Sequence, residues 1–130
     1  MIVLDTHIWF WWVNGEQKRL SPELLEAMEA VAHVGVSAVS CFEIALACRR
    51  GRIALPMPPR DWFAKALGES GVELLPLTAQ TASRAVELSD QHRDPFDRII
   101  IATALELDWQ LASVDSQFST YPELAGRLLG

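Results

Sequence analysis

Short apolar runs alternate with longer amphipathic segments along this chain, and turn or capping residues separate them. Four runs are short and nearly continuous, as is typical of strands buried on both faces of a sheet: residues 1–5, 34–39, 72–75 and 110–114. Between them, apolar residues recur at helical spacing. Strands that alternate with helices in this way predict an α/β fold, in which helices flank a central parallel sheet.

Helix start signals and helical spacing predict the helices: residues 8–13, 21–33, 40–51, 61–69, 78–90 and a segment that begins at 94. The clearest signal belongs to the last segment. Its sequence makes Asp94 the N-cap, Pro95 the first helical residue and Asp97 the third. The apolar run over residues 99–102 then predicts that this helix is buried on most sides.

Acidic residues stand at the predicted ends of several elements. Asp5 and Asp115 follow two strands, whereas Glu43, Asp94 and Asp97 lie where two helices begin. In a parallel α/β sheet, the carboxyl ends of the strands and the N-termini of the following helices share one edge. We therefore expect carboxylates from four separate elements to converge at that edge.

Each acid also has an explanation that requires no site. Asp5 and Asp94 would cap the helices that follow them, and Glu43 would complete a capping box begun by Ser40. Asp115 would be a turn residue. Capping accounts for each acid singly, but it does not account for their arrival at one edge.

A cluster of carboxylates needs protons or cations, because two unit charges about 4 Å apart repel by roughly 4 kcal/mol at an effective dielectric of about 20. Oxygen ligands without His or Cys favour a hard ion such as Mg²⁺ or Mn²⁺. Such an ion ionises water and stabilises charge on a phosphodiester, which is nuclease chemistry. A related alternative is a Mg²⁺-dependent phosphatase, but the chain has no Gly-rich phosphate loop and no second Asp two residues after Asp5.

Composition limits the remaining choices. The chain has 130 residues, half of them apolar, which fits a single domain over residues 1–130. Its net charge of −6 argues against a simple electrostatic nucleic-acid binder but not against a nuclease whose cations reverse the local potential. Without a leader or a membrane-length apolar run, we expect a cytoplasmic protein that makes no membrane contact. Cys41 and Cys48 lie about 10.5 Å apart on a predicted helix, too far for a disulfide.

Four motifs occur in order along residues 4–115: Leu4-Asp5-Thr6-His7; Ser37-Ala38-Val39-Ser40 with Phe42-Glu43-Ile44-Ala45; Arg93-Asp94-Pro95-Phe96-Asp97-Arg98-Ile99-Ile100-Ile101-Ala102; and Ser113-Val114-Asp115. Each motif is short, but their order and spacing together are specific. In these motifs the chain resembles the PIN-domain family, and more closely the VapC-type toxins of bacterial and archaeal toxin–antitoxin pairs.

The resemblance implies a PIN-like three-layer fold and a Mg²⁺-dependent (or Mn²⁺-dependent) endoribonuclease, the toxin of a type II pair. It implies that four acids are catalytic and bind the metal ion: Asp5, Glu43, Asp97 and Asp115. It gives secondary positions within the same motifs to Asp94, Thr6 and Ser113. It also implies an RNA substrate, a cognate antitoxin that blocks the site, and a toxin homodimer.

Basic residues near the motifs leave alternatives open. Arg93 and Arg98 flank the acidic turn and either contact substrate phosphate or pair with neighbouring acids. After Glu43, many members of the family that the chain resembles carry a lysine where this chain has Leu46 and Ala47. The nearest bases are Arg49, Arg50 and Arg52, and the sequence does not decide whether they contact phosphate.

Aromatic residues crowd the short helix over residues 8–13. Trp9, Trp11 and Trp12 cannot all face inward on a helix packed along one side. Either this helix is buried on several sides, or it forms a surface for an antitoxin or a second toxin. The alternative from a different functional class is a protein-binding module, or a catalytically silent PIN-like domain, whose acids only cap helices and bind no metal.

Overall fold

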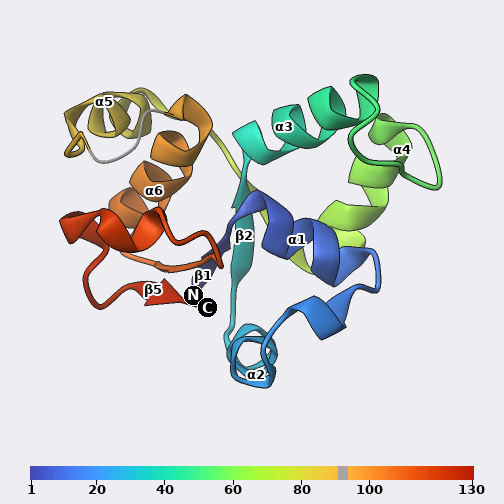
Figure 1. The fold of residues 1–130 in the computed structure, drawn as a ribbon, viewed down its shortest axis with the longest axis horizontal. Coiled ribbons are helices and arrows are strands. Elements are labelled where there is room, and N and C mark those ends of the chain that lie inside the picture. The colour runs from blue at the N-terminus through green and yellow to red at the C-terminus, as the bar shows by residue number, and fades with distance from the viewer. Residues whose placement is uncertain (91–93) are drawn as a thin grey trace.

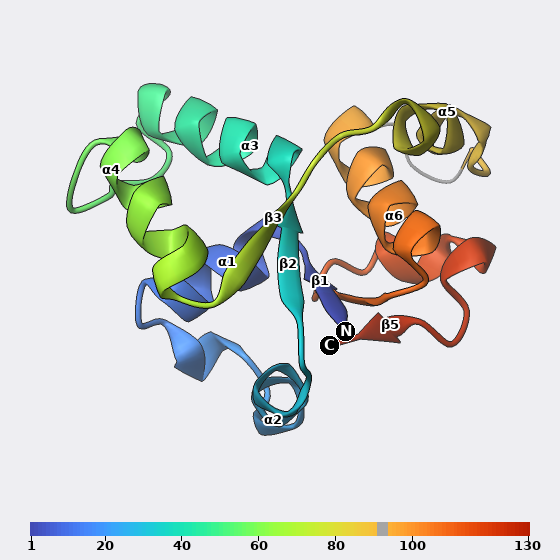
Figure 2. The same cartoon turned by 180° about the vertical axis from the view of Figure 1, so that it is seen from behind.

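The computed structural model describes residues 1–90 and 94–130, and its centre is a sheet of parallel strands (Figures 1 and 2). The strands are β1 (Ile2–Leu4), β2 (Val34–Ser37), β3 (Val72–Leu75), β4 (Gln110–Ala112) and β5 (Leu128–Leu129). Their spatial order is β3-β2-β1-β4-β5, so the first strand of the chain is the central one. Every pair of neighbours is parallel, which confirms the predicted α/β class.

Helices cover both faces of the sheet, giving the three layers that were expected (Figure 1). They are α1 (Thr6–Val13), α2 (Pro22–Ala30), α3 (Ala38–Arg49), α4 (Pro59–Ala64), α5 (Ala79–Glu87) and α6 (Pro95–Leu107). Helices α1, α3 and α4 lie on one side of the sheet, and α5 and α6 lie on the other (Figures 1 and 2). Within the described part of the chain, no helix has the length and apolar character needed to cross a membrane.

The sheet separates two hydrophobic cores because alternate residues of a strand face opposite sides. Ile2 and Leu4 of β1 face the core beneath α1 and α3, where they join Trp9 and Ile44. Val3 faces the opposite core with the buried residues of α6. All three β1 side chains are fully buried, which explains the continuous apolar pattern of this strand.

Helix α6 begins as its sequence predicted. The Asp94 carboxylate accepts a hydrogen bond from the Phe96 N–H at 2.9 Å and caps the helix, with Pro95 in the first position. Ile100 and Ile101 are fully buried. Helix α6 is therefore anchored to the core from its second turn onward, and Asp97 occupies the third position of its first turn.

The start of α3 differs from the prediction. We expected a strand through residue 39 and a cap at Ser40, but β2 ends at Ser37, whose hydroxyl accepts from the Val39 N–H at 3.3 Å. The apolar residues after Ser37 form the buried first turn of α3. In the sequence their continuous apolar pattern looks like that of a buried strand. Glu43 consequently lies in the second turn of α3, and the predicted capping box was wrong.

Other boundaries shift by a few residues. Helix α2 ends at Ala30 and α5 at Glu87, each three residues before the expected end. The helix predicted over residues 61–69 is α-helical only to Ala64; a π-helical stretch over Lys65–Glu69 follows, and Gly68 interrupts it with a φ of +71°. Strand β5 was not predicted, because two residues carry no periodic signal. The two cysteines are free thiols, as expected from their spacing, and are partly buried.

Candidate active site

The candidate site lies where the strand order reverses. Strands β2 and β3 lie on one side of β1, and β4 and β5 on the other, so the carboxyl ends of β1 and β4 border the topological switch point. Ligand sites of open α/β sheets form at this position. The first turns of α3 and α6 also approach each other at this edge (Figures 1 and 2).

Asp5 follows β1 and is held at both carboxylate oxygens. Its Oδ1 accepts from the Thr6 N–H at 2.8 Å, which caps α1, and its Oδ2 accepts from the Ser113 hydroxyl at 2.8 Å. The side chain is only 6% exposed. Burial raises the pKa of Asp5 in spite of these two hydrogen bonds, and the charge of Asp115 raises it further.

Glu43 lies opposite, on α3, and a chain of hydroxyls reaches it. The Thr6 hydroxyl donates to Glu43 Oε1 at 2.8 Å and lies 2.8 Å from the Ser40 hydroxyl. Because the single Thr6 proton points to Glu43, Ser40 must donate to Thr6. This relay fixes the carboxylate between the two helices.

The pKa of Glu43 rises from 4.5 to about 7. Burial is the largest cause, and the negative charges of Asp97, Asp5 and Asp94 add to it. These three carboxylates therefore lie within electrostatic reach of Glu43. The negative charges of all three acids raise the pKa of Glu43.

Asp94 and Asp97 come from the first turn of α6 and have different roles. Asp94 accepts from the backbone N–H groups of Phe96 and Asp97, which is capping geometry. Asp97 is partly buried. The rings of Phe42 and Phe96, whose centroids lie 5.4 Å apart, connect the two helices beside these acids.

Asp115 is the most peripheral of the predicted acids. Its side chain is exposed and accepts from the Gln117 N–H at 2.9 Å, as a turn residue does. Its backbone N–H donates to the Ser113 hydroxyl at 3.1 Å, and that hydroxyl in turn holds Asp5. Asp115 thus forms a turn, as one alternative for this residue predicted, and its charge also acts on Asp5.

The chemistry of these side chains, rather than their present spacing, suits a divalent cation. Within residues 1–90 and 94–130, no group of three or more His, Cys, Asp or Glu residues is placed so that it could hold a metal ion. The charged donors are nonetheless carboxylates, and burial, together with the charges of the neighbouring acids, raises the pKa of Glu43. A hard cation such as Mg²⁺ would relieve this repulsion.

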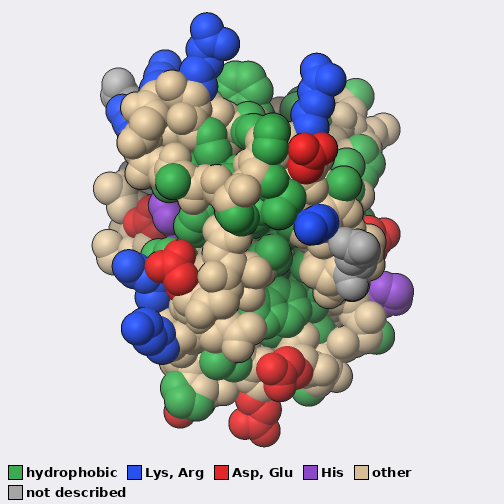
Figure 3. Space-filling view, turned by 90° about the vertical axis from the view of Figure 1, so that its right-hand side faces the viewer, with side chains coloured by type: hydrophobic (Ala, Val, Ile, Leu, Met, Phe, Trp, Pro, Cys, Tyr) green, Lys and Arg blue, Asp and Glu red, His purple; other side chains and the backbone are tan. Residues whose placement is uncertain are grey.

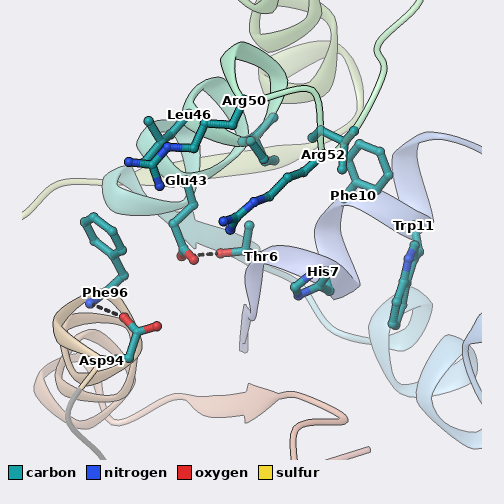
Figure 4. Close-up of a pocket in the computed structure, with 13 residues that line it drawn as sticks. Thr6, His7, Phe10, Trp11, Glu43, Leu46, Arg50, Arg52, Asp94 and Phe96 are labelled. Atoms are coloured by element: carbon teal, nitrogen blue, oxygen red, sulfur yellow. Dashed lines mark hydrogen bonds between the residues drawn. The ribbon is translucent and has the colours of Figure 1, made fainter.

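A pocket with a cavity volume of about 510 Å³ opens beside Glu43 and Asp94, whereas Asp5, Asp97 and Asp115 do not line it. Thr6, Glu43 and Asp94 line one end, and Arg50 and Arg52 line another part. Figure 4 shows Arg52 extending toward Glu43 and Thr6, which belong to different helices. Aromatic side chains complete the wall: Phe10, Trp11 and Phe96.

Arg98 was expected either to contact substrate phosphate or to pair with neighbouring acids, and the structure shows contacts of another kind. Its guanidinium donates to backbone carbonyls at the end of α5, including Ala85 at 3.0 Å, Leu88 at 2.8 Å and Ser89 at 2.9 Å. These carbonyls have no partner within a helix that ends there, and a cation satisfies them. Arg98 therefore holds α5 against α6. Arg93 lies outside the described residues.

One residue of the predicted partner surface, Trp9, is not exposed and so cannot contact a partner in this structure. Trp9 is fully buried, and its indole N–H donates to the Ala66 carbonyl at 3.3 Å. Its ring packs edge-on against Trp62, with centroids 5.1 Å apart. Helix α1 buries this residue because α4 covers it, so Trp9 is a core residue. Trp11 and Trp12 are partly buried, and a role for them in partner binding stays a prediction.

Sequence reasoning missed the hydroxyl relay and the orientation of the arginines. Ser40 was expected to cap a helix, whereas it is fully buried and contacts Thr6. Arg50 follows Glu43 by seven residues, which places both on one face of α3. That spacing was the available signal for a base beside the acids.

Comparison with known proteins agrees with this architecture. The PIN domain family model matches residues 2–124. The chain is 36% identical over 121 residues to ribonuclease VapC22 of Mycobacterium tuberculosis (strain ATCC 25618 / H37Rv), covering 92% of this chain and 91% of that protein.

Two solved structures share the fold. One is VapBC2 from Rickettsia felis bound to a DNA fragment from their promoter, with a TM-score of 0.73 and 17% identity over 99% of this chain and 98% of that chain. The other is a toxin–antitoxin complex from Klebsiella pneumoniae, with a TM-score of 0.63 and 19% identity over 100% and 97% of the two chains. By its family match and its fold, the chain belongs to the PIN-domain family.

Proposed function

We propose that this chain is a metal-dependent endoribonuclease and the toxin of a type II toxin–antitoxin pair. The main observation in support concerns Glu43, which occupies no capping position on α3. Burial and the charges of Asp97, Asp5 and Asp94 nevertheless raise its pKa to about 7. An ionised carboxylate that is partly buried near other negative charges lowers the stability of the fold, and a capping role does not account for its presence there. The likeness to ribonuclease VapC22 supports RNA as the substrate.

The proposal assigns a Mg²⁺ or Mn²⁺ ion to Asp5, Glu43 and Asp97, with Asp115 at the edge of the set. When bound, the ion would lower the pKa of a water molecule and neutralise charge on the phosphodiester. Without it, the carboxylates would repel the phosphate, so RNA binding itself depends on the cation.

The supporting residues orient the acids. Thr6 holds Glu43 through its hydroxyl, and Ser113 holds Asp5, so both carboxylates keep one rotamer. Asp94 caps α6 and thereby fixes the turn that carries Asp97. Prior orientation of ligands by hydrogen bonds strengthens metal sites.

The proposal includes an antitoxin and a second copy of the toxin. The similar structures from Rickettsia felis and Klebsiella pneumoniae are a VapBC2 complex and a toxin–antitoxin complex, which supports an antitoxin partner. A homodimer, a cytoplasmic location and a single domain over residues 1–130 are part of the same proposal.

The test compares RNA cleavage by the wild-type protein with that of Asp5→Asn and Asp97→Asn, in Mg²⁺ and in chelator. Asp61→Asn is the matched control, because Asp61 also lies in the first turn of a helix but on α4, with its side chain exposed. We expect each site variant to lose activity at least a hundredfold and the control to keep it. Equal cleavage by all the proteins would refute the assignment. Absence of cleavage by the wild type would favour a protein-binding module or a silent domain.

A further inference from the structure

Two arginines line the same pocket as Glu43 and Asp94 and, within the described part of the chain, make no side-chain contact that the fold requires. Arg50 is the C-cap residue of α3, and Arg52 follows it by two residues; both side chains are exposed and line the cavity. Among the residues that the structure describes, neither guanidinium has a hydrogen-bond or ion-pair partner. Arg98, by contrast, is occupied by the carbonyls of α5.

Helix geometry aims Arg50 at the site. Glu43 and Arg50 are two turns apart on α3, and helix side chains lean toward the N-terminus of their helix. Arg50 thus leans back along the face that carries Glu43. Arg52, beyond the helix, extends toward Glu43 and Thr6 in Figure 4. Both cations consequently lie on the approach to the acids.

We infer that Arg50 and Arg52 bind a backbone phosphate of single-stranded RNA adjacent to the phosphate that is cleaved, an inference that rests on the proposed function. The guanidinium group offers planar, paired donors that match phosphate oxygens. The net charge of −6 makes most of the surface unfavourable for RNA, so local cations must provide the attraction. Figure 3 shows Lys and Arg side chains at the upper end of one face, above exposed hydrophobic side chains.

The rest of the pocket favours an unstacked nucleotide over a duplex. Its cavity of about 510 Å³ lies within the range of roughly 300–1,000 Å³ that is typical of small-ligand sites. Phe10, Trp11 and Phe96 add aromatic rings to the lining of this pocket, with Phe96 beside Asp94 and Phe10 and Trp11 on the other side of Arg52 (Figure 4). Bases are presented to aromatic side chains only when they are unpaired, so the pocket suits a single strand.

The inference is tested by steady-state cleavage and equilibrium binding of a fluorescent single-stranded oligoribonucleotide over a range of salt concentrations. The variants are Arg50→Gln, Arg52→Gln and Arg50→Lys. Arg49→Gln is the matched control, since Arg49 lies on the same helix with an exposed side chain that does not line this pocket. Melting temperatures verify that all the variants are folded.

We expect each Gln variant to raise KM about tenfold with little change in kcat. The slope of log affinity against log salt should fall by about 0.7, the value for one lost phosphate contact on a single strand. Arg50→Lys should keep the salt slope, because it keeps the charge. Arg49→Gln should behave as the wild type.

The outcomes separate this inference from the function on which it rests. If the wild type cleaves RNA but both Gln variants keep its KM and salt slope, the phosphate subsite is refuted and the nuclease stands. If those variants instead lose only antitoxin binding, the subsite is likewise refuted, because the arginines then serve a protein partner. If the wild type binds RNA through these arginines without cleaving it, the subsite stands and the nuclease fails. A wild type that neither binds nor cleaves RNA refutes both.

Discussion

Replacing Glu43 by glutamine should stabilise the metal-free protein above pH 7 while removing a ligand of the proposed ion. Glutamine keeps the shape and the oxygen that accepts from Thr6. It removes the negative charge that burial and the neighbouring acids disfavour. The same substitution is thus expected to raise stability and to abolish activity.

The magnitude follows from the pKa of Glu43, which rises from 4.5 to about 7 on folding. At about 1.36 kcal/mol per pKa unit this corresponds to roughly 3 kcal/mol, and solvent screening at a partly exposed side chain reduces it to about 1–2 kcal/mol. The folded state binds the proton more tightly, so wild-type stability falls as pH rises from about 4.5 to about 7. Above this pH range, the ionised Glu43 lowers the free energy of unfolding by its full amount.

The assay is urea unfolding of the wild type, Glu43→Gln and the control Glu26→Gln between pH 4 and pH 8 in chelator. Glu26 is an exposed acid on α2. We expect Glu43→Gln to exceed the wild type by about 1–2 kcal/mol at pH 8, with the difference vanishing near pH 4. A variant that is less stable than the wild type at pH 8, or a difference independent of pH, would contradict the electrostatic account of this residue.

Further substitutions at Arg98, Thr6 and Trp9, the last compared with Trp12, test particular contacts. Arg98→Met should lose about 2–4 kcal/mol of unfolding free energy, because the terminal carbonyls of α5 lose their donors, and a loss below about 0.5 kcal/mol would show that water replaces them. Thr6→Val should lower kcat/KM about tenfold with the fold retained, since the donor to Glu43 is removed, and unchanged kinetics would exclude the hydroxyl relay. Trp9→Ala should cost about 3–5 kcal/mol in thermal or urea unfolding and Trp12→Ala less than half of that; equal losses would argue against the buried position of Trp9.

Features that depend on local sequence were predictable. The cap at Asp94, the position of Asp97 and the burial of α6 follow from a short stretch whose cap, proline and apolar run agree. The parallel sheet follows from the alternation of elements, and the convergence of Asp5 with the helix starts follows from that topology. These inferences need no knowledge of how distant helices pack.

Features that depend on tertiary packing were not predictable. The first turn of α3 is apolar because it is buried, so the pattern extended the preceding strand and misplaced Glu43 relative to its helix. The sequence left open whether Trp9 is buried or belongs to a partner surface, because the packing of α4 against it is a tertiary contact. Arg98 lies close to two acids in the sequence, but only the fold shows that its guanidinium donates to the terminal carbonyls of α5.

The central claim is that acids from separate elements jointly bind one divalent cation. Calorimetric titration of Mn²⁺ into the wild type, Asp97→Asn and the control Asp61→Asn measures this directly at constant pH. The account predicts saturable binding to the wild type and the control, and loss of at least tenfold in affinity in Asp97→Asn. Equal Mn²⁺ affinity in all three proteins, or no binding to the wild type, would contradict it.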